Sequence, residues 1–156
     1  MALDFPGLLG DGVKLAYVND ASPPVTCRLQ PLLDIPQVPA KEADELENTC
    51  HGSGGDHTYT LGLNKIPNIT AKLLFDASDA YHLDMITRQA AKTVTTFYIE
   101  VPANAAGTTF LRWTLDAVVK KAAVSTPIAG LQEMDLELLY SANLVPATTP
   151  VASIIT

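Results

Sequence analysis

The side chains in this sequence that could do chemistry are three histidines, two cysteines and two groups of carboxylates. Cys50 and His51 are adjacent and His57 follows closely, which suggests a metal site. Their spacing matches no standard zinc pattern, because the second Cys-x-x-Cys or His-x-x-x-His half is absent. In a reducing compartment Cys27 and Cys50 are expected to be free thiols. We therefore predict no metal site.

Nucleophilic catalysis has no better support. His82 falls in a helical segment, where we expect it at the surface, and no GxSxG elbow accompanies any histidine. The glycine-rich stretch at Ser53-Gly54-Gly55 lacks the GxxxxGK[ST] pattern of a phosphate-binding loop. The sequence predicts no catalytic residue and no cofactor, so we expect a protein that is not an enzyme.

Two groups of acids remain. The first group comprises Glu42, Asp44, Glu45 and Glu47. It lacks the EF-hand pattern, so we favour a solvated face over a Ca²⁺ site. The second, Glu133, Asp135 and Glu137, occupies alternate positions of an expected strand. Neighbouring carboxylates could hydrolyse glycosides, but no aromatic sugar platform accompanies them. Acids in a row repel one another and resist burial, so this face must meet water, either in open solvent or in a pore.

Length and composition limit the options. The 156 residues favour one domain covering 1–156, with 47% hydrophobic and 17% charged residues. So few charges suit a subunit that buries surface against its own copies and suit an ordinary soluble domain equally well. The net charge of −7 disfavours a grip on nucleic acid. No signal peptide or apolar run of membrane-spanning length is present, so we expect a cytosolic protein without membrane contact.

The pattern of elements predicts a mainly β chain, a sandwich or barrel of antiparallel strands with one flanking helix. Alternation and β-branched content predict strands at 12–18, 25–29, 57–63, 68–75, 93–101, 109–124 and 131–140. The helix is expected over 76–92, with Asp76 or Ser78 as its N-cap. Its apolar stripe is expected to comprise Leu83, Ile86 and Ala90.

Between two of these strands runs a long acid-rich loop arm, 34–56. Its prolines keep its start extended, and residues 40–47 could form a short helical turn. A loop of this length in a compact domain is usually a binding or assembly segment. Its length and low apolar content lead us to expect that it does not bury itself. The segment 1–11 is expected to be extended, and the uncharged tail 141–156 is expected to be extended or mobile.

The order of these elements resembles the major tail tube proteins of long-tailed bacteriophages, which are related to the type VI secretion tube protein. The resemblance runs from about Val13 to about Pro146. Its motifs are Asp34-Ile35-Pro36, Gly54-Gly55, Gly62-Leu63, the helix start at 76–81 and the strand Phe97-Tyr98-Ile99-Glu100-Val101-Pro102. The chain departs from the family at Cys50-His51 and in its short tail, which adds no immunoglobulin-like domain.

The resemblance implies a structural virion protein whose hexameric rings stack into a tail tube, through which DNA passes at ejection without specific binding. Its partners would be copies of itself and other tail proteins, namely the tape measure, tail tip and terminator proteins. Assembly would take place in the cytoplasm of the host bacterium. We expect the arm to pack on a neighbouring subunit, in the same ring or the next, through Asp34, Ile35, Pro36, Glu42, Asp44, Glu45, Glu47, Gly54 and Gly55. Glu133, Asp135 and Glu137 could face the lumen. A small β-sandwich module that binds carbohydrate or protein is the alternative.

Overall fold

A computed structural model describes residues 12–48, 59–127 and 130–155 of the chain. The elements follow in the order β1 (Lys14–Val18), β2 (Thr26–Leu29), β3 (Leu32–Asp34), β4 (Glu42–Glu47), β5 (Tyr59–Lys65), β6 (Ile69–Leu74), α1 (Ala80–Ala91), β7 (Val94–Pro102), β8 (Phe110–Ser125) and β9 (Glu133–Val145). The predicted class is confirmed: the chain is mainly β and antiparallel, with one helix in the described part.

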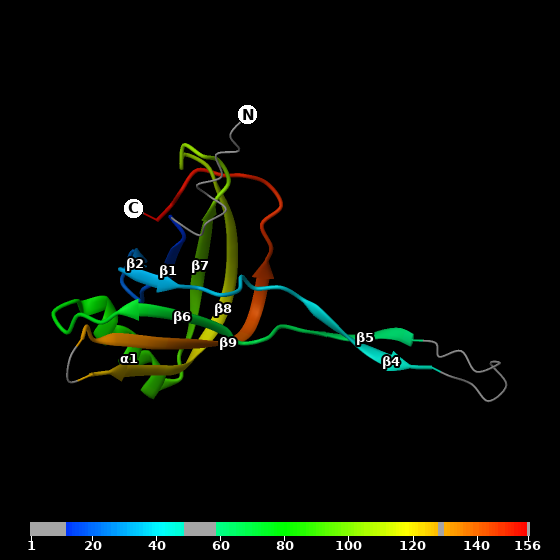
Figure 1. The fold of residues 1–156 in the computed structure, drawn as a ribbon, viewed down its shortest axis with the longest axis horizontal. Helices are drawn as coiled ribbons and strands as arrows, with labels where there is room; N and C mark the ends of the chain where they lie inside the picture. The colour runs from blue at the N-terminus through cyan, green and yellow to red at the C-terminus, as the bar shows by residue number, and fades with distance from the viewer. Residues whose placement is uncertain (1–11, 49–58, 128–129, 156) are drawn as a thin grey trace.

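Seven strands form one curled sheet in the order β2-β1-β7-β8-β9-β6-β3, and β4 pairs with β5 alone in a hairpin that leaves the body (Figure 1). The long strand β8 pairs with β7 from Phe110 to Val118 and with β9 from Thr114 to Ser125, so its middle residues pair on both sides. Register shifts along β8 and β9 bend the sheet, as β-bulges do, so it wraps around the core without closing into a barrel. No helix in the described residues is long and apolar enough to cross a membrane.

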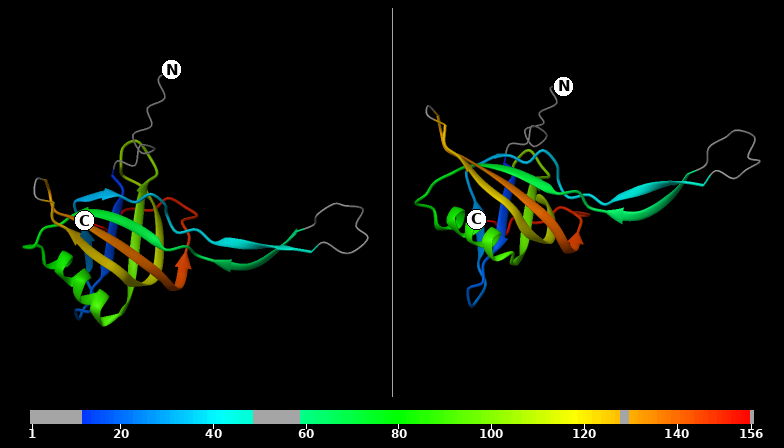
Figure 2. Two further views of the ribbon diagram at one scale, coloured as in Figure 1. Left: turned by 60° about the horizontal axis from the view of Figure 1, so that its bottom comes forward. Right: turned by 90° about the horizontal axis from the view of Figure 1, so that it is seen from below.

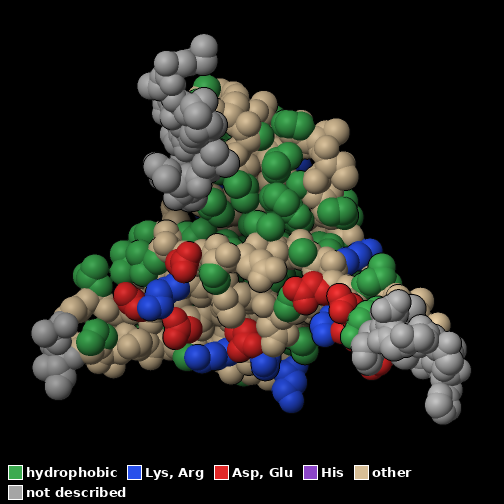
Figure 3. Space-filling model, turned by 45° about the vertical axis from the view of Figure 1, so that its right-hand side comes forward, with side chains coloured by type: hydrophobic (Ala, Val, Ile, Leu, Met, Phe, Trp, Pro, Cys, Tyr) green, Lys and Arg blue, Asp and Glu red, His purple; other side chains and the backbone are tan. Residues whose placement is uncertain are grey.

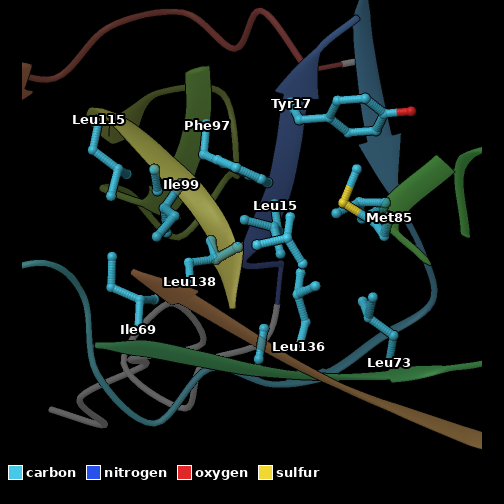
Figure 4. Packing of buried hydrophobic residues seen from close by; sticks show 14 of the residues in the cluster. Leu15, Tyr17, Ile69, Leu73, Met85, Phe97, Ile99, Leu115, Leu136 and Leu138 are labelled. Carbon is cyan, nitrogen blue, oxygen red and sulfur yellow. The ribbon is translucent and has the colours of Figure 1, made fainter. Parts of the chain in front are cut away.

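The core lies inside this curl and is built by strict alternation. Met134, Leu136 and Leu138 of β9 are at most 1% exposed. They stand opposite Leu73, Ala71 and Ile69 of β6, which point to the same side of the sheet. Side chains of β1, β7 and β8 meet them from across the curl (Figure 4). Successive strand residues point to opposite faces, so the acids between these apolar residues are forced outward.

The helix α1 lies against the body at the end opposite to the hairpin (Figure 2). Its N-cap is Asp79, whose side chain accepts a hydrogen bond from the Tyr81 amide at 2.9 Å. The prediction of Asp76 or Ser78 as the cap is therefore wrong. The Asp76 carboxylate instead accepts hydrogen bonds from the Ser78 amide and hydroxyl, which lower the pKa of Asp76 and form a turn before the helix.

The cap geometry gives a first prediction. Asp79→Ala leaves a first-turn amide without its acceptor, and we expect it to lower the free energy of unfolding by about 1 kcal/mol in urea titrations. The matched control is Thr87→Ala on the exposed face of the same helix, which should change the free energy by less than about 0.5 kcal/mol. Equal effects of the two substitutions would show that Asp79 does not stabilise the helix.

The buried face of α1 differs from the predicted stripe. Leu83 is 45% exposed, and the buried residues are His82, Met85 and Arg88. His82 is fully buried, so the prediction of a surface histidine is wrong. Its Nδ1 accepts a hydrogen bond from the Asp76 amide at 3.0 Å, and its ring stacks on Phe75. The apolar count along the helix missed this face because two of its three residues are polar.

The tail 141–156, predicted to be extended or mobile, is extended over its first residues. The strand β9 continues to Val145, and Val151 then forms a β-bridge with Phe110. Ile155 is only 1% exposed, so the described end of the chain is packed on the body. The segment 1–11, for which an extended conformation was predicted, lies outside the described residues.

Candidate assembly surfaces

The predicted loop arm is a β-hairpin. Its strands β4 and β5 pair antiparallel, with Glu45 opposite Leu61 and Glu47 opposite Tyr59. The short helical turn predicted at 40–47 is therefore wrong. The strand predicted at 57–63 is present as β5 over its described residues, but it pairs in the hairpin and not in the seven-stranded sheet. Residues at the start of the arm do bury themselves, contrary to expectation: Ile35 and Val38 pack against the core.

The two faces of the hairpin have different chemistry. Residues directly opposite in an antiparallel pair share a face, so Tyr59 and Leu61 lie beside Glu47 and Glu45. Leu63 follows on β5 at a register shift of the pairing. Tyr59, Leu61 and Leu63 are 61%, 74% and 87% exposed, so β5 presents exposed apolar side chains next to the acids of β4. We call the surface of these three residues the apolar arm face.

On the opposite face of the hairpin, Leu46 packs over the other strand but stays 57% exposed. Leu46 lies over Gly62, where an added Cβ would come within 3.1 Å of Leu46 Cγ and of the Asp44 carbonyl oxygen. Glycine is needed here for the close approach of the two strands. Lys65 and Asp44 form an ion pair at 2.5 Å and tie the strands together near the base. The hairpin therefore holds its shape by its own contacts and presents the apolar arm face outward.

Most of the predicted arm residues lie on or near this hairpin. Asp34 ends β3, and Ile35 and Pro36 follow at the base. The four acids Glu42, Asp44, Glu45 and Glu47 are all exposed on β4. Gly54 and Gly55 lie outside the described residues. The sequence pattern predicts a strand with Tyr59, Leu61 and Leu63 on one face, but it does not predict that the acid-rich residues 42–47 form the partner strand.

The outer face of β6, β8 and β9 forms a second surface, on which acidic and basic side chains lie side by side (Figure 3). Glu133, Asp135 and Glu137 are there, as the alternation requires. Each is paired: Lys72 Nζ lies 2.8 Å from Glu133, Lys120 Nζ lies 2.8 Å from Glu137, and Lys121 Nζ lies 3.9 Å from Asp135. We call this surface the mixed-charge face. Its three acids do not form the bare carboxylate row that the sequence suggested.

A hollow of about 390 Å³ lies beside the mixed-charge face. It opens between the base of the arm, at Asp34 and Pro36, and the mixed-charge face, at Lys72, Lys121 and Asp135. The two segments meet here because β3 pairs with β6 only through Leu32 and Asp34 before the chain turns away into the arm.

The mixed-charge face gives a prediction about pH. Lys120 and then Asn68 donate hydrogen bonds to Glu137 and hold the pKa of that carboxyl below its usual range. A lowered folded-state pKa stabilises the fold above the unfolded pKa, and the contribution is lost as pH falls through the folded value. We expect Lys120→Met to raise the pKa of Glu137 in an NMR titration of its carboxyl carbon, and Asn68→Ala to raise it less. An unchanged midpoint in Lys120→Met would contradict the pairing.

The described residues hold no cluster of three or more histidine, cysteine or acidic side chains that could bind a metal ion. Cys27 is a buried free thiol. Cys50, His51 and His57, which prompted the question of zinc, lie outside the described residues, as does the Ser53-Gly54-Gly55 stretch. His82 is too deeply buried to meet a substrate.

Comparison with solved structures finds the same fold in phage-like particles. A chain of the anti-feeding prophage baseplate aligns with a TM-score of 0.64 at 12% identity, covering 86% of this chain and 92% of that one. A chain of the tail of an empty GTA particle gives 0.60 at 14%, covering 94% and 100%. The SPP1 tail tube gives 0.56 at 13%, covering 87% and 77%.

Comparison by sequence finds no match: no protein-family model and no curated protein matches the chain. At identities of 12 to 14% the structural likeness concerns the fold. The resemblance noted in the sequence is confirmed at that level: this chain has a fold shared with tail tube and baseplate structures of phage-like particles.

Proposed function

We propose that this chain is a structural subunit that polymerises as stacked hexameric rings into a phage tail tube, the conduit for DNA at ejection. The observation that carries the proposal is the apolar arm face, presented on a hairpin that projects from a body with this fold (Figure 1). Large apolar side chains gathered on a projecting hairpin are costly in water, and such patches mark association sites. The role is structural, with neither catalysis nor a cofactor.

The arm is the contact that joins copies in this proposal. Its apolar face packs on a neighbouring subunit, in the same ring or the next one. The acids Glu45 and Glu47 border that face and would form a polar rim around it, as at other protein interfaces. The base of the arm, anchored through Ile35 and Val38, fixes the direction in which the hairpin projects.

The mixed-charge face is proposed to line the lumen. Glu133, Asp135 and Glu137 supply negative charge there, and the lysines beside them reduce the field of the wall. Hydrated charges of both signs give DNA no cluster of free cations to bind, because Lys72, Lys120 and Lys121 on this face already have carboxylate partners. DNA would pass such a wall without specific binding.

The partners of the subunit would be its own copies and the tape measure, tail tip and terminator proteins of the same tail. The protein would act in the virion tail after assembly in the cytoplasm of the host bacterium. Negative-stain electron microscopy of the purified chain tests the proposal. We expect rings or tubes with six-fold symmetry at high protein concentration. A chain that stays monomeric under all conditions and binds a carbohydrate or protein ligand would instead favour a binding module.

A further inference from the structure

A buried charged cluster lies where the C-terminal segment returns to the body. Glu100 of β7 is fully buried and accepts a hydrogen bond from Arg112 Nε at 2.8 Å. Its other bonds go to the tail: the Ser153 hydroxyl donates to Oε2 at 2.5 Å, and the Ile154 amide donates to Oε1 at 3.1 Å. A buried carboxylate is expensive unless it is fully paired, and here two of its three donors belong to the C-terminal segment.

Two cations of the body complete the cluster. Lys14 Nζ donates to Ser153 Oγ at 3.0 Å and to the Ile155 carbonyl at 2.8 Å, and it lies 4.7 Å from the centre of the Phe110 ring. Arg112 Nη2 donates to the Ala152 carbonyl at 2.5 Å. The body thus supplies every charge, and the segment supplies backbone groups and one hydroxyl. Residues 141–156 contain no charged side chain.

The segment also adds to the sheet. β9 pairs with β8 from Thr114 onward, so the first residues of β8 lie beyond the end of β9. Val151 covers that edge through two backbone hydrogen bonds with Phe110, of 2.8 and 2.9 Å. Extended peptides are commonly recognised in this way, by strand addition at an open edge together with pockets for particular side chains.

The body recognises the side chains at two positions of the segment, Ser153 and Ile155. The Ser153 hydroxyl donates to a carboxylate and accepts from an ammonium, which only a small hydroxyl side chain can do in that place. Ile155 is 1% exposed and fills an apolar site two residues later. Ile154 between them is 43% exposed, as expected where an extended strand alternates.

We propose that Glu100, Arg112 and Lys14 form a peptide-binding site for an extended, uncharged segment with a small hydroxyl residue followed two positions later by an aliphatic one. Its occupant is the chain's own segment 151–155, which acts as a releasable cap on the β8 edge at Phe110. The connection through Pro146 and Pro150 carries exposed residues and leaves the cap free to detach without unfolding β9. This inference does not depend on tube assembly.

The test separates the cap from its site in the full-length chain. Ile155→Asp places a charge in the apolar site and should release the segment, whereas Ile154→Asp at the exposed neighbouring position is the matched control. We expect hydrogen exchange at Phe110 and at 151–155 to accelerate at least about tenfold in Ile155→Asp and to stay unchanged in the control. Unchanged exchange in Ile155→Asp would overturn the proposal.

A fluorescent synthetic peptide of residues 146–155 then probes the emptied site by anisotropy. We expect Ile155→Asp to bind it at least about tenfold more tightly than the wild type or Ile154→Asp, whose sites are filled. The same peptide with Ser153→Ala should bind about tenfold more weakly. Ser153→Glu, which opposes a carboxylate to Glu100, serves as a second released variant if Ile155→Asp fails to fold. Equal binding by released and wild-type chains, or no binding by a folded released variant, would refute the site.

Discussion

Replacing Leu61 and Leu63 by aspartate is expected to abolish assembly while leaving a folded monomer. Both side chains are largely exposed in the single chain, so the monomer loses no core contact. In an assembled contact each buried leucine contributes about 1.5 to 3 kcal/mol, so removing two of them costs about 3 to 6 kcal/mol per arm. Two unpaired charges in the contact add to that cost. Sedimentation velocity and electron microscopy of the double variant would measure the effect.

The matched control for this prediction is Thr60→Asp. Thr60 is exposed on the same strand but shares its face with Leu46, away from Tyr59 and Leu61. Thr60→Asp adds a negative charge next to position 61 on β5. Any general effect of added negative charge, or of weakened β4–β5 pairing, therefore appears in both variant proteins. Assembly should survive in Thr60→Asp. Normal tubes from the Leu61 and Leu63 double variant would show that the arm contacts no neighbour through this face.

Local alternation made most of the body predictable. The sequence predicts β9 together with its apolar face and its acidic face. Met134, Leu136 and Leu138 alternate strictly with acids, and a strand has a period of two residues. The same logic failed on Tyr59, Leu61 and Leu63. Periodicity shows which residues share a face, but it cannot show whether a core exists behind that face. Here the partner of β5 is the acidic strand β4, and only the pairing reveals it.

Other features depended on contacts far apart in the sequence. The lysines that pair with Glu133, Asp135 and Glu137 come from β6 and β8, so the sequence of β9 alone suggested a bare acidic row. The packed tail was missed for the same reason, since Glu100 precedes Ser153 by more than fifty positions. Residues that bind through the tertiary fold leave no local signal.

Arg88→Met, which changes a single buried side chain, is expected to lower the free energy of unfolding in urea by about 3 kcal/mol. Arg88 is 5% exposed, and its guanidinium donates to Asp84 at 2.9 Å, Asp20 at 2.8 Å and Thr95 at 2.9 Å. These acceptors belong to α1, the β1–β2 turn and β7, so one fork joins three parts of the fold. Removing one partner of a buried ion pair costs about 3 to 5 kcal/mol, and the partly exposed acids here favour the lower end of that range.

The two carboxylates that Arg88 binds, Asp20 and Asp84, should contribute differently to the free energy of unfolding. The Asp20 side chain is 77% exposed and can return to water, so Asp20→Ala should cost less than about 1 kcal/mol. Asp84 is 32% exposed and also accepts from the Tyr17 hydroxyl at 2.7 Å. Burial, and then this hydrogen bond, raise the pKa of Tyr17, so its proton stays in place to satisfy Asp84 when Arg88 is removed. Arg88→Lys keeps the charge but loses the planar guanidinium with its several donors. Its loss of stability should lie between those of Asp20→Ala and Arg88→Met. A loss below about 1 kcal/mol in Arg88→Met would mean that packing of the side-chain stem, and not the fork, holds the helix to the sheet.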